Sequence, residues 1–95
     1  MRRVLIDGGG VATPDDVYDA FSAQLALAPE FGRNLDALWD VLTVDVAGPL
    51  EIVWQDAARS RARLGDAFEP FERLFRDLAL VRSDVQVRID DERAA

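Results

Sequence analysis

The sequence contains neither cysteine nor histidine. Without cysteine the chain can form no disulfide framework and no thiolate zinc site, which suits a reducing cytoplasm. Without histidine it lacks the commonest general base, the usual Ser and Cys catalytic triads and the commonest metal ligand. We therefore predict no metal, no cofactor and no enzymatic activity, although chemistry with carboxylates alone stays open.

Basic residues are fewer than acidic ones: 11 Lys and Arg against 18 Asp and Glu give a net charge of −7 at pH 7. Phosphate binding needs clustered Lys and Arg, so this balance argues against direct binding of nucleic acid. It favours a basic partner, although cytosolic domains are often acidic simply for solubility. The apolar runs are too short to span a bilayer, and no signal peptide follows Met1. We expect a cytoplasmic protein with no membrane contact.

Ninety-five residues, 49% of them hydrophobic, suffice for one small domain with a single core. We place this domain at residues 1–90 and expect a frayed tail at residues 91–95. Three segments have strand patterns. Residues 3–7 form a short apolar run that indicates a buried strand, residues 50–54 are rich in β-formers, and residues 84–90 alternate as in an edge strand with one covered face.

Four segments have helical signals. The first begins with Thr13 as N-cap and is broken by Pro29 and Gly32. The others are expected at about residues 34–43, 55–63 and 66–80, the last with Asp66 as N-cap, and residues 44–49 are expected to form a loop. Two helices between successive strands favour an α/β fold, a small three-stranded parallel sheet packed by about four helices.

The second predicted helix has the most distinctive pattern. Asn34 is a good N-cap, and Leu35, Leu38 and Leu42 would form one apolar stripe. The adjoining face carries Asp36, Asp40 and Thr43, with Trp39 at its edge. Two carboxylates at an i,i+4 spacing repel each other by a few tenths of a kcal/mol. A short helix that bears this cost and has a tryptophan beside its two carboxylates indicates a surface for a cationic partner.

Two other interpretations of Asp36 and Asp40 are open from the pattern alone. They could be solvated helix acids with no partner. They could also be the acid and base of a small hydrolase, because their Cβ atoms would lie about 6 Å apart, a spacing compatible with glycosidases. We disfavour catalysis because both side chains should face solvent, where neither is poised as an acid near neutrality.

Two basic or glycine-rich features could suggest phosphate or nucleic-acid binding. Gly8-Gly9-Gly10 should be a flexible turn, since it lacks the Gly-Lys-Ser/Thr of a P-loop and the spaced glycines of a dinucleotide fingerprint. Arg59, Arg61 and Arg63 have no aromatic among them and belong to a strongly acidic chain. We interpret them as a solvated helix face.

Residues 32–40, Gly-Arg-Asn-Leu-Asp-Ala-Leu-Trp-Asp, followed by Leu42-Thr43 and by Pro-Leu-Glu-Ile-Val-Trp at residues 49–54, closely resemble the barstar family of intracellular ribonuclease inhibitors. The match is ungapped and extends from the first predicted strand to the last. Members have a three-stranded parallel sheet with four helices, so the resemblance implies the same fold class as the residue patterns.

The resemblance also implies which residues bind a partner. Asp36 and Asp40 match the two helix acids that members insert toward the nuclease active site, Trp39 the aromatic beside them, Gly32 a backbone approach point and Asn34 the residue that opens the helix. The full predicted partner-binding set is Glu30, Phe31, Gly32, Asn34, Asp36, Trp39, Asp40, Thr43, Asp45, Leu74 and Asp77.

By this resemblance the protein would inhibit a microbial guanyl-preferring ribonuclease in a 1:1 complex. Its acidic helix face would mimic RNA phosphates in the basic active site of that extracellular enzyme. The alternative is an immunity module for a basic toxin that is not a ribonuclease.

The chain departs from the family pattern at four positions. Glu30, Asp45 and Ala47 stand where the pattern has a tyrosine, a tryptophan and an acid. Arg33 replaces a family acid and would partly offset the negative charge of this surface. We therefore predict a ribonuclease from another branch than the enzyme that barstar inhibits.

Overall fold

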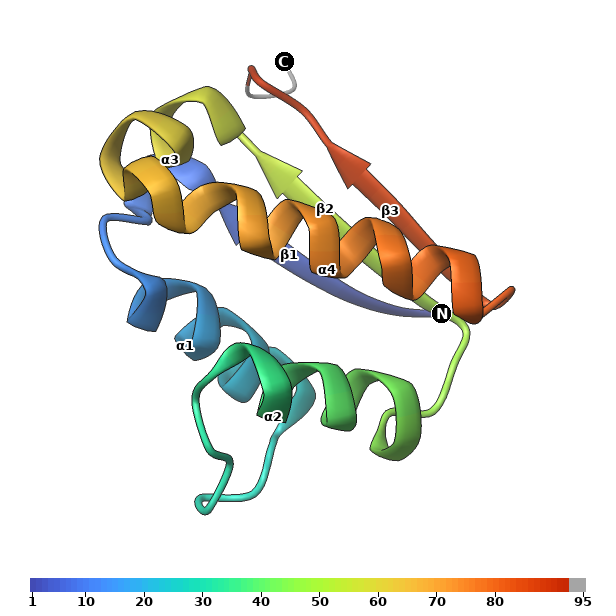
Figure 1. Ribbon diagram of the computed structural model, residues 1–95. Coiled ribbons are helices and arrows are strands. Elements are labelled where there is room, and N and C mark those ends of the chain that lie inside the picture. The colour runs from blue at the N-terminus through green and yellow to red at the C-terminus, as the bar shows by residue number, and fades with distance from the viewer. Residues whose placement is uncertain (93–95) are drawn as a thin grey trace.

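The structure, a computed structural model, describes residues 1–92 and is built on one sheet (Figure 1). Its strands are β1 (Arg2–Asp7), β2 (Leu50–Gln55) and β3 (Val85–Ile89). All pairings are parallel and the strand order is β1-β2-β3. The predicted fold class is confirmed, and β3 is an edge strand, as its alternating pattern indicated.

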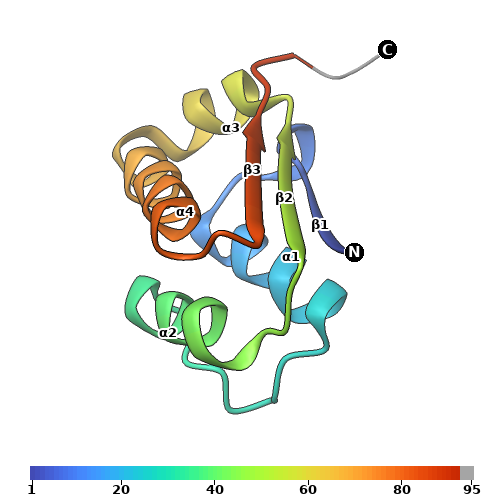
Figure 2. The same ribbon diagram turned by 90° about the vertical axis from the view of Figure 1, so that its right-hand side faces the viewer.

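Four α-helices accompany the sheet: α1 (Pro14–Leu25), α2 (Leu35–Asp40), α3 (Ala57–Leu64) and α4 (Phe68–Val81). Figure 2 shows α2, α3 and α4 on one side of the sheet. α1 contacts β1, α4 contacts β3, and α2 packs against α4. Within residues 1–92 no helix is long and apolar enough to cross a membrane.

Trp54, near the end of β2, is the largest fully buried side chain. Its ring lies 4.9 Å from that of Phe68 and 5.9 Å from that of Phe75, both on α4. Its Nε1 donates a hydrogen bond of 2.9 Å to Ser60 Oγ on α3, and Ser60 Oγ donates one of 3.0 Å to the carbonyl of Gly8. This buried chain of hydrogen bonds joins β2, α3 and the segment after β1, because a buried indole N–H needs an acceptor.

The three glycines form a turn, as predicted, and it is a short 3₁₀ turn, Gly8–Gly10. A Cβ at Gly8 would overlap the backbone carbonyl oxygens of Gln55 and Asp56, whereas a Cβ at Gly10 would meet nothing within 4 Å. Gly8 is therefore needed for a close approach between the end of β1 and the end of β2. This packing explains the glycine without any phosphate ligand.

The prediction of a buried strand at residues 3–7 was wrong at Leu5, which is 41% exposed. Val4 and Ile6 are completely buried on the helix side of the sheet, and Leu5 lies on the other face. The backbone of Leu5 is protected instead, because the side-chain amide of Gln24 both accepts from its N–H and donates to its carbonyl, at 2.8 Å each. Gln24 thereby pairs with this outer edge of the sheet.

Three predicted helix boundaries were also wrong. α1 ends at Leu25, before Pro29, because Ala26 adopts a left-handed conformation with φ of 51°. Gln55 belongs to β2, so α3 begins at Ala57. Asp66 lies within a 3₁₀ turn, and Ala67 is the N-cap of α4. Each of these boundaries coincides with a local change in backbone conformation, which the side-chain pattern did not indicate.

The predicted tail begins inside the described part of the chain. Asp91 accepts a hydrogen bond of 3.1 Å from Arg61 Nη1 through its carboxylate and one of 3.3 Å from Ala58 N through its carbonyl. These bonds connect it to α3. Residues 93–95 of the predicted tail lie outside the described residues.

Candidate functional site

The α2 segment is formed locally as its sequence predicts. Asn34 is the N-cap, and its Oδ1 accepts a hydrogen bond of 2.8 Å from Ala37 N. Leu38 and Leu42 are completely buried, so they attach one side of the helix to the core. After Asp40 the segment continues as a π-helical turn, Val41–Asp45, so the predicted loop begins two residues later than the expected residue 44.

The opposite side of α2 presents carboxylates to solvent. Asp36 and Asp40 are exposed, and neither carboxylate forms an ion pair or hydrogen bond with any residue from 1 to 92. The same is true of Glu30, Asp45 and Asp77 in that part of the chain. The acids of the predicted set therefore keep their hydrogen-bonding capacity for an external cation.

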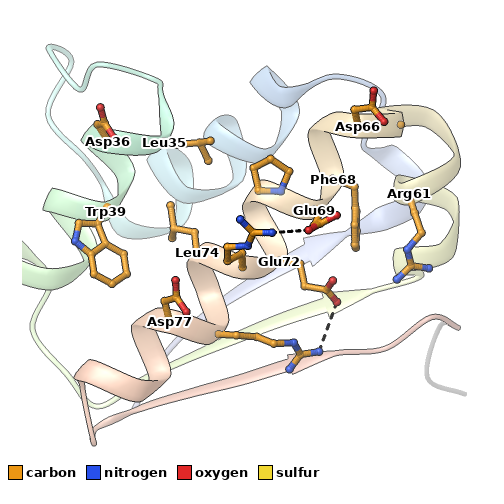
Figure 3. A pocket seen from close by; sticks show the side chains of 14 residues that line it. Leu35, Asp36, Trp39, Arg61, Asp66, Phe68, Glu69, Glu72, Leu74 and Asp77 are labelled. Atoms are coloured by element: carbon orange, nitrogen blue, oxygen red, sulfur yellow. Dashed lines mark hydrogen bonds and ion pairs between the residues drawn. The ribbon is translucent and has the colours of Figure 1, made fainter.

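A groove of about 1100 Å³ runs between α2 and α4. Figure 3 shows Trp39 and Leu74 between the two helices, with Asp36 on the α2 side and Asp77 on α4. Leu74 is 8% exposed, and Trp39 is half-buried. The structure thus brings four residues of the predicted set to one groove, which has apolar residues between the helices and is lined by both acidic residues and arginines.

The remaining predicted residues divide into two groups. Glu30, Phe31 and Asp45 line a second, smaller hollow beside the end of α1. The others line neither hollow: they are Gly32, Asn34, Asp40 and Thr43. The predicted set is therefore not a single pocket. It is an extended surface along the α2 segment that includes the groove between α2 and α4 and the smaller hollow beside the end of α1.

Two polar side chains of the predicted set are occupied by the backbone. Asn34 uses its amide oxygen for the N-cap and donates from Nδ2 to the carbonyl of Gly32 at 3.1 Å. Thr43 Oγ1, in the π-helical turn, donates to the carbonyl of Trp39 on α2 at 2.7 Å. Both residues shape the helix, and direct contact of either with a partner stays a prediction.

Arg33 contacts α1, which the sequence analysis did not predict. It has a positive φ of 48°, and its guanidinium turns toward α1, where Nη2 lies 2.6 Å from Asp19 Oδ1 and Nε lies 3.6 Å from Asp15 Oδ1. The hydrogen bond to Asp19 raises the pKa of Arg33. From the sequence we expected this arginine to offset the charge of the acidic surface. It instead connects the turn before α2 to α1.

Sequence reasoning also missed the first half of α4 as part of the groove. Asp66, Glu69, Pro70 and Arg73 line it together with the α2 residues. Glu69 Oε1 is paired with Arg73 Nη2 at 2.6 Å and Glu72 Oε2 with Arg76 Nη2 at 3.6 Å. Asp66, in the 3₁₀ turn before α4, is unpaired among the described residues. The spacing of Pro70, Leu74 and Asp77 places them on one helix face, and this signal could have found the groove.

These features are suited to binding a cationic partner. Residues 1–92 contain no group of three or more acidic, His or Cys side chains able to hold a metal ion. The unpaired carboxylates can accept charge-assisted hydrogen bonds from Arg, Lys or protonated His of a partner, and the exposed part of Trp39 adds apolar area.

Comparison with known proteins gives two agreeing results. Residues 1–92 match the family described as "Barstar (barnase inhibitor)". The chain is also 33% identical over 92 residues to a Bacillus subtilis (strain 168) protein named "Putative ribonuclease inhibitor YrdF", an alignment that covers 97% of this chain and 93% of that protein.

Proposed function

The chain belongs to the barstar family, and on that premise we propose that it is an inhibitor of a microbial guanyl-preferring ribonuclease. The inhibitor would act in the cytoplasm, where it is made, by forming a 1:1 complex with an enzyme that is otherwise secreted. The enzyme's active site would be rich in basic side chains, and the inhibitor itself would catalyse no reaction.

The observation that carries this proposal is the state of the carboxylates on α2. Asp36 and Asp40 are one helical turn apart, exposed and without a partner among residues 1–92. Most other described acids of the chain have an arginine or a backbone N–H beside them. An acidic surface without its own cations matches a basic cleft in charge.

A ribonuclease that activates the 2′-hydroxyl of RNA binds the substrate phosphate with a cluster of cationic side chains. In the proposed complex Asp40 and Asp36 occupy that cluster, because a carboxylate and a phosphate accept the same hydrogen bonds from Arg, Lys and His. Trp39 and Leu74 pack against the rim of the cleft, and Asp77 pairs with a further cation. RNA is excluded because its phosphate site is already filled.

The rest of the proposed contact surface favours a target that differs from barnase. Glu30 and Asp45 line the second hollow and have no partner among residues 1–92, so they extend the negative surface along the α2 segment. Ala47 is exposed and carries no charge there. A target with additional basic residues around its active site would fit this surface better than one that needs aromatic contacts at these positions.

The test is titration of the protein into assays of secreted microbial guanyl-specific ribonucleases, with barnase among them. The proposal expects complete inhibition of at least one enzyme at one equivalent. Turnover of any substrate would instead support the hydrolase interpretation. If no ribonuclease is inhibited and a basic toxin of another activity is neutralised, the proposal is wrong and the immunity-module interpretation replaces it.

A further inference from the structure

Arg82 lies far from Asp36 and Asp40 in the sequence but contacts the segment that carries them. It follows the last residue of α4, and its side chain is only 15% exposed. Its Nη1 donates hydrogen bonds to the carbonyl of Leu42 at 2.7 Å and to the carbonyl of Val46 at 2.8 Å. These carbonyls lie within and just after the π-helical turn Val41–Asp45 that continues α2.

The π-helical turn leaves backbone acceptors that need a partner. Val46 N donates to the carbonyl of Val41, five residues earlier, at 3.0 Å. The last carbonyls of any helical segment lack an intrahelical donor, and the negative end of the helix favours a cation there. Arg82 supplies both the donors and the positive charge. It therefore caps the C-terminal end of the α2 segment, although it lies elsewhere in the sequence.

Arg82 is itself held firmly. Its Nε and Nη2 donate to the two carboxylate oxygens of Asp84 at 3.0 and 2.8 Å. Its backbone N–H donates to Leu78 at the end of α4, and the carbonyl of Asp84 accepts from Leu50 N at the start of β2. A Cβ at Gly48 would overlap the Asp84 carboxylate. The orientation of the guanidinium is therefore set by contacts with α4 and the sheet.

From these contacts we propose that Arg82 is a positioning residue for partner binding. It fixes the C-terminal end of the α2 segment so that Asp36, Trp39 and Asp40 are presented in one orientation. Arg33 does the same at the N-terminal end through Asp19. Binding by a preorganised surface avoids the entropy cost of ordering it in the complex, which mainly lowers the dissociation rate. This inference rests on the proposed ribonuclease inhibition.

The chain offers a closely matched control. Arg88 and Asp90 on the β3 side repeat the Arg82–Asp84 arrangement with the same spacing, and their Nε to Oδ2 distance is 2.8 Å. Arg88 has no hydrogen bond to the α2 segment among those of residues 1–92. Arg82→Gln and Arg88→Gln remove the same charge, so any difference between them is not a change in long-range electrostatic steering.

The experiment combines hydrogen exchange on the free protein with stopped-flow kinetics on the complex. Arg82→Gln should exchange the Val46 amide about tenfold faster and dissociate from the inhibited ribonuclease about tenfold faster, as expected for the loss of hydrogen bonds from a charged group. Arg88→Gln should change neither rate by more than about twofold. Arg82→Lys, which can bond the carbonyls but cannot hold Asp84 in the same way, should lie between them.

Several results decide the inference. An unchanged Val46 exchange rate in Arg82→Gln would overturn it, and so would faster exchange with an unchanged dissociation rate. A lower melting temperature with wild-type dissociation would mean that Arg82 has a structural role only. If Arg82→Gln does not fold, the same comparison uses Arg82→Lys and Asp84→Asn.

If the wild-type protein inhibits no ribonuclease, the proposed function fails. The exchange rate of the Val46 amide alone then supports or overturns the anchoring of the α2 segment by Arg82.

Discussion

α2 and α3 flank β2 in the chain, and both are short helices with charged surfaces. On α3 the charges are paired within the protein: Arg59 lies 3.7 Å from Asp56, Arg61 3.1 Å from Asp91, and Arg63 donates to the carbonyl of Gly9. The guanidinium of Arg61 also lies over the ring of Phe68. On α2 the carboxylates of Asp36 and Asp40 have no such partner among residues 1–92.

The difference separates charges that stabilise the fold from charges that are available to a partner. The arginines of α3 fasten this helix to the glycine turn and to the segment after β3, although exposed ion pairs contribute little each. The acids of α2 repel each other slightly in the free protein and can gain a strong interaction only with an external cation. Substitutions around α3 should therefore change stability, and substitutions on α2 should change binding.

The largest expected effect is on binding. Asp40→Ala should weaken the ribonuclease complex by several kcal/mol, the magnitude known for charged interface residues of barstar itself and carried over to this chain by family membership. Calorimetric titration would measure it. Glu92→Ala is the control, because Glu92 is also an exposed acid without a partner among residues 1–92. The segment after β3 lies at the opposite end of the molecule from α2 (Figures 1 and 2). Equal losses for both variants would remove the special role of α2.

The next effect is on stability at the α3 end. Gly8→Ala should lower the free energy of unfolding by about 3 kcal/mol, because a Cβ there overlaps two backbone carbonyls of the β2–α3 connection. Gly10→Ala, two residues away with open space around it, should change it by less than about 1 kcal/mol. Urea denaturation compares the two. If the Gly8 variant were as stable as the Gly10 variant, the close approach would not be needed.

A smaller effect concerns the rate of association. The unpaired acids and the net charge of −7 should steer a basic ribonuclease toward the α2 surface. Raising the ionic strength from about 0.01 to about 1 M should slow association at least about tenfold, and should change dissociation much less. Stopped-flow mixing at several salt concentrations measures both rates. An association rate that does not depend on salt would contradict electrostatic complementarity.

The smallest effect is the acid dependence of stability at α1, where a carboxylate again serves the fold. Asp16 accepts hydrogen bonds from the backbone N–H groups of Ala12 and Thr13, and these bonds lower its pKa below the ordinary 3.8. A carboxyl with a lowered pKa stabilises the folded state fully above its unfolded pKa, and this contribution is lost as the pH falls through the folded pKa. Stability should therefore decline below about pH 4. Asp16→Asn should show a shallower decline in urea titrations between about pH 4 and pH 2. An identical decline in both proteins would exclude this contribution.

Much of the architecture could be predicted because its signals are local. Asn34 as N-cap of α2, Thr13 as N-cap of α1 and the alternation in β3 each depend on neighbours a few residues away. The acidic pattern of Asp36 and Asp40 also followed from helical periodicity alone. The exposure of Leu5 could not be predicted in this way, because an apolar run does not tell whether one or both faces of a strand are covered.

The amino-acid sequence by itself determined which segments become strands and helices and which helix carries the paired aspartates, because these depend on periodicity and capping over one or two turns. Only the tertiary structure decided which charges are neutralised. Arg33 reaches α1 across 14 residues of sequence, and Arg82 reaches the carbonyl of Leu42 across 40. Such contacts depend on how the helices pack on the sheet, and this packing leaves the acids of α2 without a cation of their own among residues 1–92.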